Sequence, residues 1–409
     1  MSEVMGTYRE DMDVSYAVDF GRDREPVQKR SRFPEYRRKG NAPARVSGMH
    51  CRRNKRWTWG SGRGARMLNM RSFAGSMAFA VASLAAAAFG VTIDYATVGN
   101  PGNAVNTNGW GAVSDVFKIS KYETTNTQYV EFLNAVDSAG TNPNGVYNAS
   151  MGSDALGGIS FNTGASAGAK YSVKAGTAPS GVAYTNMPVL FTTWFSAARF
   201  ANWLQNGQQA SAASMETGAY TLNNQTSGPI VARNAGATTV LPSRDEWYKS
   251  AFYDGSSYKT WATNSNTQPT NTITNLTLAN AANYGFSSTP TTNPIAVGSY
   301  INTASPYGVY DMMGNATEYT DTAGTGGSAG RPQIFSGSWA VALRDASTWN
   351  ATAAGIFRNS TTATSQVGFR VAAVPEPATI ALAGVGIAGL AGLDWMKRRK
   401  KKPVARIEA

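Results

Sequence analysis

The chain has 409 residues and a formal net charge of +12, and this length allows one large domain or two modest ones. The charge is uneven, since residues 1–90 carry 17 Lys/Arg and 8 Asp/Glu, residues 91–374 carry 13 and 14, and residues 375–409 carry 7 and 3. The middle segment is therefore nearly neutral and lacks the electrostatic basis for binding a polyanion. We expect no nucleic-acid partner.

Residues 1–66 are polar and basic and show no apolar periodicity, a composition typical of disordered chain. This extension is too long for the positively charged start of an ordinary signal peptide. Two interpretations are open. Either the start codon is assigned too early, with the true start at Met67 or Met70, or the protein carries a genuine basic extension.

Residues 67–90, MLNMRSFAGSMAFAVASLAAAAFG, have the layout of a secretory signal peptide. Arg66 and Arg71 precede an apolar run, and small residues at Ala86 and Ala88 suit cleavage close to residues 88–90. The alternative is a buried, alanine-rich helix. A core helix rarely follows so many arginines directly, so the pattern favours export.

Export makes the positions of cysteine and histidine decisive. The only histidine is His50 and the only cysteine is Cys51, and both precede the predicted signal peptide. The exported chain would then contain no disulfide, no thiol or imidazole nucleophile, and no soft ligand for copper, iron or zinc. Carboxylates, carbonyls, amides and hydroxyls remain, and these groups suit calcium and sugars.

The middle of the chain predicts one strand and three helices between long loops. Strand-like residues 116–123 precede a helix that starts at Thr124 or Thr125, with apolar residues spaced i, i+3, i+4 and i+7. A second helix follows Thr193, with one apolar face, and ends at Gly207. The loops are rich in Ser, Thr, Asn and Gly and cover residues 140–181, 205–238 and 256–293.

A third, short helix follows residue 242. Ser243 and Glu246 have the spacing of a capping box, and Gly255 marks the expected end. Because few apolar anchors lie between the helices, residues 91–374 are expected to form one domain with much irregular chain.

Six blocks follow one another in an order that resembles the formylglycine-generating enzyme family, also called sulfatase-modifying factor proteins. The blocks are KYETTNTQYVEFLNAV, MPVLFTTWFSAARFANWL, LPSRDEWYKSAFYDG, SPYGVYDMMGNATEYTD, FSGSWAVALRDAS and VGFRVAA. The resemblance covers residues 91–374 and implies an α+β fold with a C-type-lectin-like core. That fold has two main helices, a small antiparallel sheet and extensive loops.

The resemblance also implies a structural calcium ion at the block DMMGNATEY. Carried over position by position, Asp311 and Glu318 would supply side-chain oxygens, and Gly314 and Ala316 would supply backbone carbonyls. The alternative is a hydrogen-bonded turn without an ion. A second calcium site would use Asn283 and the carbonyl of Tyr284, although the acidic partner expected after them is missing.

The same alignment removes the catalytic groups of the family. Its two copper-binding cysteines correspond to Val341 and Ala346, so we expect no copper, iron or zinc chemistry. Arg370 is expected to pair with a carboxylate under the last strand.

Four residues are candidates to line the groove of the family. An aromatic face beside Arg and Asp suits a sugar or an extended peptide, and the candidates are Trp339, Arg344, Asp345 and Trp349. The alternative is that Trp339 is a core residue and that the charged side chains are solvated.

Residues 375–402, PEPATIALAGVGIAGLAGLDWMKRRKKK, resemble the PEP-CTERM sorting signal. An apolar run over residues 378–393, a little short for a bilayer, follows Pro-Glu-Pro and precedes a basic cluster, with Asp394 as a departure from the pattern. The resemblance implies processing by an exosortase, attachment through a transmembrane helix, and sorting to the envelope or the exopolysaccharide matrix. A plain single-pass anchor is the alternative, and residues 403–409 would be a cytoplasmic tail.

Two functional classes are therefore open, besides a structural matrix protein with no defined ligand. The first is an exported, non-catalytic, calcium-stabilised binding module whose loops hold a glycan or a protein. The second is an enzyme, either an oxidoreductase of the formylglycine-generating type or one of unfamiliar mechanism, that keeps the groove of the family without its cysteines.

Overall fold

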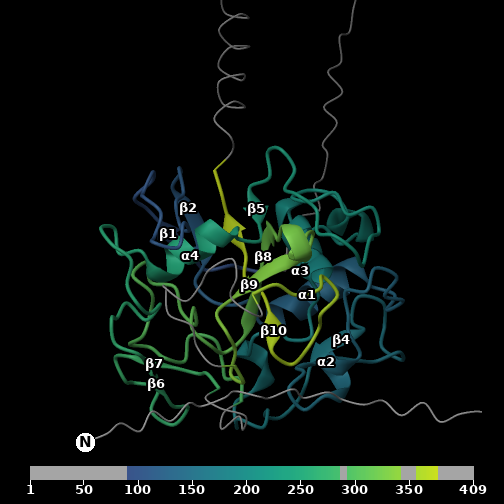
Figure 1. The fold of residues 1–409 in the computed structure, drawn as a ribbon. Coiled ribbons are helices and arrows are strands. Elements are labelled where there is room, and N and C mark those ends of the chain that lie inside the picture. The colour runs from purple at the N-terminus through teal and green to yellow at the C-terminus, as the bar shows by residue number, and fades with distance from the viewer. Residues whose placement is uncertain (1–89, 286–292, 342–355, 376–409) are drawn as a thin grey trace, which may run out of the picture. The chain divides into compact units, whose positions relative to one another are not determined.

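The computed structural model describes residues 90–285, 293–341 and 356–375, and Figure 1 shows the ribbon. The predicted extension, nearly all of the signal peptide and the C-terminal signal beyond Pro375 lie outside these residues. Within the described ranges, no helix is long and apolar enough to cross a membrane.

The first and last parts of the described chain meet in a four-stranded sheet. Its order is β1-β2-β11-β5 and every neighbouring pair is antiparallel. Ala372 of the last strand lies opposite Ile119 on one side and Val240 on the other. The strands are β1 (Tyr95–Val98), β2 (Phe117–Ser120), β5 (Thr239–Val240) and β11 (Ala372–Ala373).

A second sheet has three strands in the order β10-β8-β9. β8 (Thr317–Ala323) pairs antiparallel with β9 (Pro332–Phe335), with a register shift between Tyr319 and Ala323, and parallel with β10 (Val367–Gly368). The remaining described strands form two two-stranded ribbons. They are β3 (Ile159–Phe161) with β4 (Tyr171–Val173) and β6 (Thr270–Asn271) with β7 (Ala281–Ala282).

Three helices occur where the sequence predicts them. Each begins with a capping box, in which a hydroxyl accepts the N3 amide hydrogen while the N3 side chain accepts the cap amide hydrogen. The cap of the third, Ser243, pairs with Glu246 as predicted. The helices are α1 (Asn126–Val136), α3 (Trp194–Gln205) and α4 (Arg244–Phe252), and the short turns are α2 (Ser150–Ser153), η1 (Tyr184–Asn186), η2 (Ala212–Met215) and η3 (Gly326–Ser328).

Helix α3 is more deeply buried than its sequence predicts. The apolar pattern indicates one inward face, but residues 194–203 are all buried, including Arg199 and Asn202. The loop that follows compensates these polar groups, since Arg199 pairs with Glu216 at 2.6 Å and Asn202 donates to the carbonyl of Tyr220 at 2.9 Å. These polar side chains can therefore be buried in the core because the loop after α3 supplies their hydrogen-bond partners.

The core connects α1, α3 and the chain that leads into the last strand. Phe200 of α3 packs against Phe132 of α1 and against Phe369, with ring centroids 5.4 Å apart in both cases. Figure 1 shows α1 and α3 on one side of the paired strands β8 and β9, and the ribbon of β6 and β7 on the other. The prediction of an α+β domain with a small antiparallel sheet and extensive loops is confirmed.

Candidate functional site

The segment predicted to hold calcium lies between three distant parts of the chain. The amide of Tyr310 donates to the carbonyl of Lys121 at 2.8 Å, that of Gly314 to Ser336 at 3.0 Å, and that of Asn315 to Asn283 at 2.7 Å. These bonds attach the segment to the residue that follows β2, to the loop after β7 and to the residue that follows β9.

Gly314 is required by this close approach. Its φ is +88°, and a Cβ at this position would lie 2.0 Å from the carbonyl oxygen of Asn283. Asp311 has a φ of +55°, which turns the chain sharply just before the glycine. The local backbone is therefore a tight turn whose shape depends on tertiary contacts.

Glu318, a predicted calcium ligand, is engaged by Arg370. Both side chains are fully buried, and the guanidinium donates to each carboxylate oxygen at 2.6 Å. The indole nitrogen of Trp247 donates to the same carboxylate at 2.7 Å. The predicted pairing of Arg370 is thus confirmed, and most of the acceptor capacity of Glu318 is already used.

Glu123 is a functional candidate that the sequence reasoning missed. It is 1% exposed, one carboxylate oxygen accepts the amide hydrogen of Ala316 at 3.2 Å, and the other, Oε2, is buried without a hydrogen-bond partner among the described residues. Burial and then the charge of Asp311 raise its pKa well above the ordinary value. The only signal in the sequence was an acid two residues before the cap of α1.

Asp311 faces the same negative surroundings. Its Oδ2 accepts the amide hydrogen of Gly298 at 2.6 Å, and burial raises its pKa to about 6, an effect that this hydrogen bond and the charge of Arg370 oppose. When all three carboxyl groups of Glu123, Asp311 and Glu318 are ionised, Arg370 is the one cation among the described residues that offsets them. A bound cation or retained protons must compensate the remaining charge.

The space around these carboxyl groups suits an ion rather than an organic ligand. One cavity of about 30 Å³ is lined by Glu123, and another of about 10 Å³ is lined by Asp311. Such volumes admit a water molecule or a single ion. In the described part of the chain no three Asp, Glu, His or Cys side chains converge to hold a metal, so carbonyl oxygens would have to complete any calcium shell.

The second predicted calcium site has one orphaned atom. The side-chain amide of Asn283 donates to the carbonyl of Asn293 at 2.9 Å, while its Oδ1 is buried without a partner in the described structure. The carbonyl of Tyr284, which the second site would need, accepts a hydrogen of the side-chain amide of Asn271 at 2.5 Å.

Trp339, the first groove candidate, is a packing residue. It is 9% exposed, its indole nitrogen donates to the carbonyl of Ser365 at 2.9 Å, and its amide donates to Asn315 at 3.0 Å. These contacts hold the end of β9 to the turn of residues 311–316, called below the calcium-type turn. Arg344, Asp345 and Trp349, and also Ala346, lie outside the described residues.

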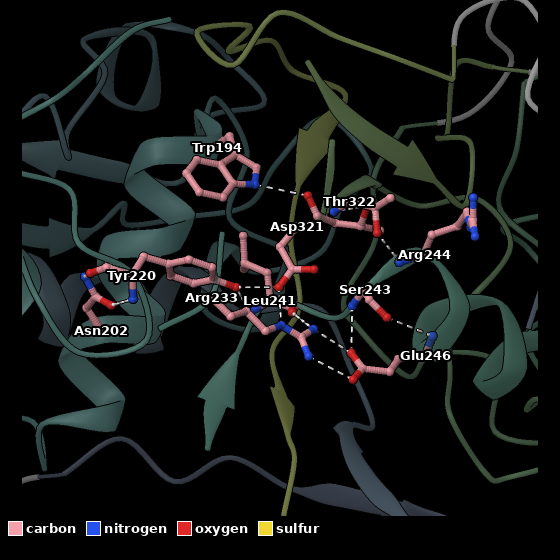
Figure 2. Close-up of polar contacts among 11 residues, drawn as sticks. Trp194, Asn202, Tyr220, Arg233, Leu241, Ser243, Arg244, Glu246, Asp321 and Thr322 are labelled. Atoms are coloured by element: carbon pink, nitrogen blue, oxygen red, sulfur yellow. Dashed lines mark hydrogen bonds and ion pairs between the residues drawn. The ribbon is translucent and has the colours of Figure 1, made fainter. Parts of the chain in front are cut away.

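A second charged cluster joins α4 to β8, and Figure 2 shows how its side chains meet. The guanidinium of Arg233 contacts the carboxylate of Asp321 and donates to both oxygens of Glu246, at 2.9 and 2.6 Å. Tyr220 donates its hydroxyl hydrogen to Asp321 at 2.8 Å. Because Arg233 holds both carboxylates, neither is poised as a general base, and the cluster is a connection between elements.

Comparison with known proteins identifies two sequence matches. Residues 104–374 match the family described as the Sulfatase-modifying factor enzyme 1-like domain, and residues 373–400 match the PEP-CTERM protein-sorting motif. No curated protein matches the chain.

Solved structures that match this chain include CarF, Treponema denticola variable protein 1 and PvdO from Pseudomonas aeruginosa. CarF is 20% identical with a TM-score of 0.44, covering 69% of this chain and 99% of its own. The Treponema protein is 18% identical with a TM-score of 0.41, covering 69% and 95%. PvdO is 17% identical with a TM-score of 0.36, covering 70% and 93%.

Proposed function

Because the chain belongs to the sulfatase-modifying factor family and ends in a PEP-CTERM motif, we propose that it is an exported, non-catalytic binding module stabilised by calcium. The sorting motif makes it an exported, envelope-associated protein that an exosortase processes and that is anchored to the membrane. The proposal adds a role in the exopolysaccharide matrix, where the domain would hold a glycan or a protein.

One observation carries the non-catalytic part of the proposal. Val341 stands at the position that the resemblance assigns to a copper-binding cysteine, and its side chain is 38% exposed at the end of the turn that follows Trp339. The only cysteine of the chain is Cys51, which precedes the predicted signal peptide. Without a thiol, the domain cannot bind copper(I) as the family does or carry thiol redox chemistry.

An activity measurement tests this part. The purified protein, supplied with copper and a cysteine-containing peptide, is expected to consume no oxygen and to leave the peptide thiol unchanged. Sustained oxygen consumption that tracks peptide oxidation would overturn the proposal and favour an enzyme of unfamiliar mechanism.

The calcium part is supported by the buried charge around Glu123. The carboxylates of Glu123 and Asp311, with carbonyl oxygens of the 311–316 turn, would hold the ion, while Glu318 stays with Arg370. These residues fit a hard cation because one carboxylate oxygen is buried without a partner and negative charge is in excess. Calcium would supply the missing positive charge and hold the turn to the chain before α1.

Thermal unfolding tests the calcium site. Asp311→Asn should abolish the rise in Tm that calcium gives the unmodified protein, while the Tm in chelator should not fall. Glu131→Gln removes an exposed carboxylate of α1 and serves as the matched control, with an unchanged calcium response. Equal Tm values of the unmodified protein in calcium and in chelator would contradict the site.

Retention on the exopolysaccharide of the producing cell tests the binding role. The purified protein is expected to be retained in calcium, and less so in chelator if the ion shapes the binding loops. Absence of retention in both buffers would overturn the matrix role.

A further inference from the structure

A cavity of about 340 Å³ lies where three loops meet, away from the carboxyl groups described above. The loops are residues 227–229, residues 329–331 just before β9, and residues 359–361. This volume falls within the range of small-molecule sites, and it is far larger than the cavities beside Glu123 and Asp311.

The walls of this cavity are held by hydrogen bonds within the protein. The hydroxyl of Ser360 donates to the carbonyl of Gly228 at 2.6 Å, and the amide of Ile230 donates to Gly330 at 2.9 Å. The carbonyl of Ser360 accepts the amide hydrogen of Trp194 at 3.0 Å, which ties the cavity to the start of α3. The cavity therefore exists before any ligand binds, and binding requires little ordering of the loops.

Gly330 keeps two of the loops in contact. Its φ is +73°, and a Cβ there would lie 2.8 Å from the Cβ of Pro229. Any other residue would push the two walls apart.

Three polar side chains that line the cavity have no hydrogen-bond or ion-pair partner among the described residues. No hydrogen bond or ion pair of this part of the chain engages the guanidinium of Arg331, and the same holds for the side-chain amide of Asn359 and the hydroxyl of Thr361. Ser227 adds another hydroxyl, and none of the described residues that line the cavity is Asp or Glu. The site thus combines one uncompensated positive charge with neutral hydrogen-bonding groups.

From this combination we propose that the cavity binds an anionic sugar unit of a surface polysaccharide. The guanidinium of Arg331 would receive the acidic group of the sugar, because it forms paired hydrogen bonds with carboxylate or sulfate oxygens. Asn359, Thr361 and Ser227 would bind the ring hydroxyls. This inference rests on the proposed matrix role and names the chemistry of its ligand.

The lining also indicates how the sugar would be recognised. The lining contributed by the described residues contains no aromatic side chain, so none of these residues can stack on a sugar ring. Recognition would then depend on charge and hydrogen bonds, and it should weaken with rising salt because Arg331 is exposed.

Calorimetric titration of the full protein tests the proposal with defined probes. The probes are an oligogalacturonate, the same oligosaccharide as its methyl ester, a heparin-derived sulfated oligosaccharide, and a neutral dextran oligosaccharide. We expect at least one acidic probe to bind. Comparison of the uronate with the sulfated sugar shows whether the site prefers a carboxylate or a sulfate. The ester and the dextran should bind about ten-fold more weakly or not at all.

Substitutions locate the binding in this cavity. Arg331→Gln should weaken binding of the acidic probe by about ten- to hundred-fold, and Asn359→Ala should weaken it less. Lys118→Gln makes the same change of charge at an exposed position on β2 and should leave binding unchanged. All three variants should keep the Tm of the unmodified protein, since these side chains have few internal contacts.

Several outcomes would overturn the cavity inference, and they differ from failure of the matrix role. Binding that is equal for the acid and its ester, or that survives Arg331→Gln, contradicts the site. If the unmodified protein is retained on its exopolysaccharide and Arg331→Gln does not reduce that retention, the cavity inference fails and the matrix role stands. If acidic probes bind through Arg331 but the exopolysaccharide does not retain the protein, the matrix role fails and the cavity stands.

Discussion

Arg370 is fully buried, and its guanidinium is surrounded by acceptors from separate parts of the chain. It donates to both oxygens of Glu318 at 2.6 Å, to the carbonyl of Ser120 at 3.0 Å and to that of Tyr310 at 3.0 Å. One side chain therefore connects β2, the calcium-type turn and β8. Removing it would leave a buried carboxylate without its charge partner.

We expect Arg370→Met to lower the free energy of unfolding by about 3 to 5 kcal/mol, the typical cost of breaking one side of a buried ion pair. Urea unfolding followed by tryptophan fluorescence measures the change. Lys121→Met is the matched control, because Lys121 forms an exposed pair with Asp94 and should show no measurable loss. A similar stability for the two variants would contradict the structural role of Arg370.

A second prediction at the residue scale concerns pH. In the metal-free protein, burial raises the pKa of Asp311 from 3.8 to about 6. The folded state then holds a proton that the unfolded state has already released, so the stabilising contribution is complete below about pH 4 and is lost as the pH rises to about 6. Glu123, whose pKa is also raised by burial, acts in the same direction.

Denaturant unfolding in chelator, at pH values from 4 to 7, measures this dependence. Asp311→Asn should remove the decrease in stability between pH 4 and 6, and Glu131→Gln should not. If the stability of the unmodified protein instead rises between pH 4 and 6, and Asp311→Asn removes that rise, then the pKa of Asp311 is lowered by folding and the prediction is wrong.

At the scale of elements, α4 is attached to β8 through charge as well as packing. Arg233 connects Glu246 in the first turn of α4 to Asp321 of β8, and it also donates to the carbonyl of Leu241 at 2.8 Å (Figure 2). Trp247 of the same helix stacks on Phe335 of β9 with centroids 4.7 Å apart. The helix thus depends on a loop residue that lies well before it in the chain.

We expect Arg233→Met to destabilise the protein by about 3 kcal/mol or more, since two buried carboxylates then lie close together without a cation. The effect should be larger at pH 7 than at pH 4, because protonation relieves the repulsion. Guanidinium unfolding at both pH values is the measurement. Arg244→Met changes a partly exposed arginine of the same helix and should cost much less.

The three helices could be predicted from the sequence because helix caps and apolar spacing depend on residues that are neighbours in the chain. The threonine that starts α1, the capping box of α4 and the apolar spacing from Tyr129 to Val136 are local patterns. The predicted end of α4 at Gly255 was late, since the helix ends at Phe252. The Ser/Thr/Asn-rich stretches were read as loops, but they contain β3, β4, β6 and β7, each too short for a periodic signal.

For the whole molecule, the match to the family domain and the match to the sorting motif overlap by two residues. The family match ends at residue 374 and the PEP-CTERM match begins at residue 373. β11 ends at Ala373 and pairs with β2 and β5, so the last described strand of the domain is complete where the two matches meet.

Deletion of residues 376–402 should therefore move the protein from the envelope fraction to the medium without unfolding the domain. Fractionation of the producing cell with immunoblotting measures location, and the Tm of the released protein tests folding. A deleted protein that stays with the envelope would mean that the domain itself, rather than its C-terminal signal, holds it there.

The sequence by itself determined the charge distribution, the helix caps, the order of the family blocks and the sorting motif, because each is a property of neighbouring residues. Only the tertiary structure decided how the buried charges are shared. Glu318 is paired with Arg370, 52 residues away, and Glu123 approaches the turn of Ala316 across 193 residues. Whether a carboxylate is free for an ion depends on which distant groups surround it in a medium of low dielectric, and no local pattern contains that information.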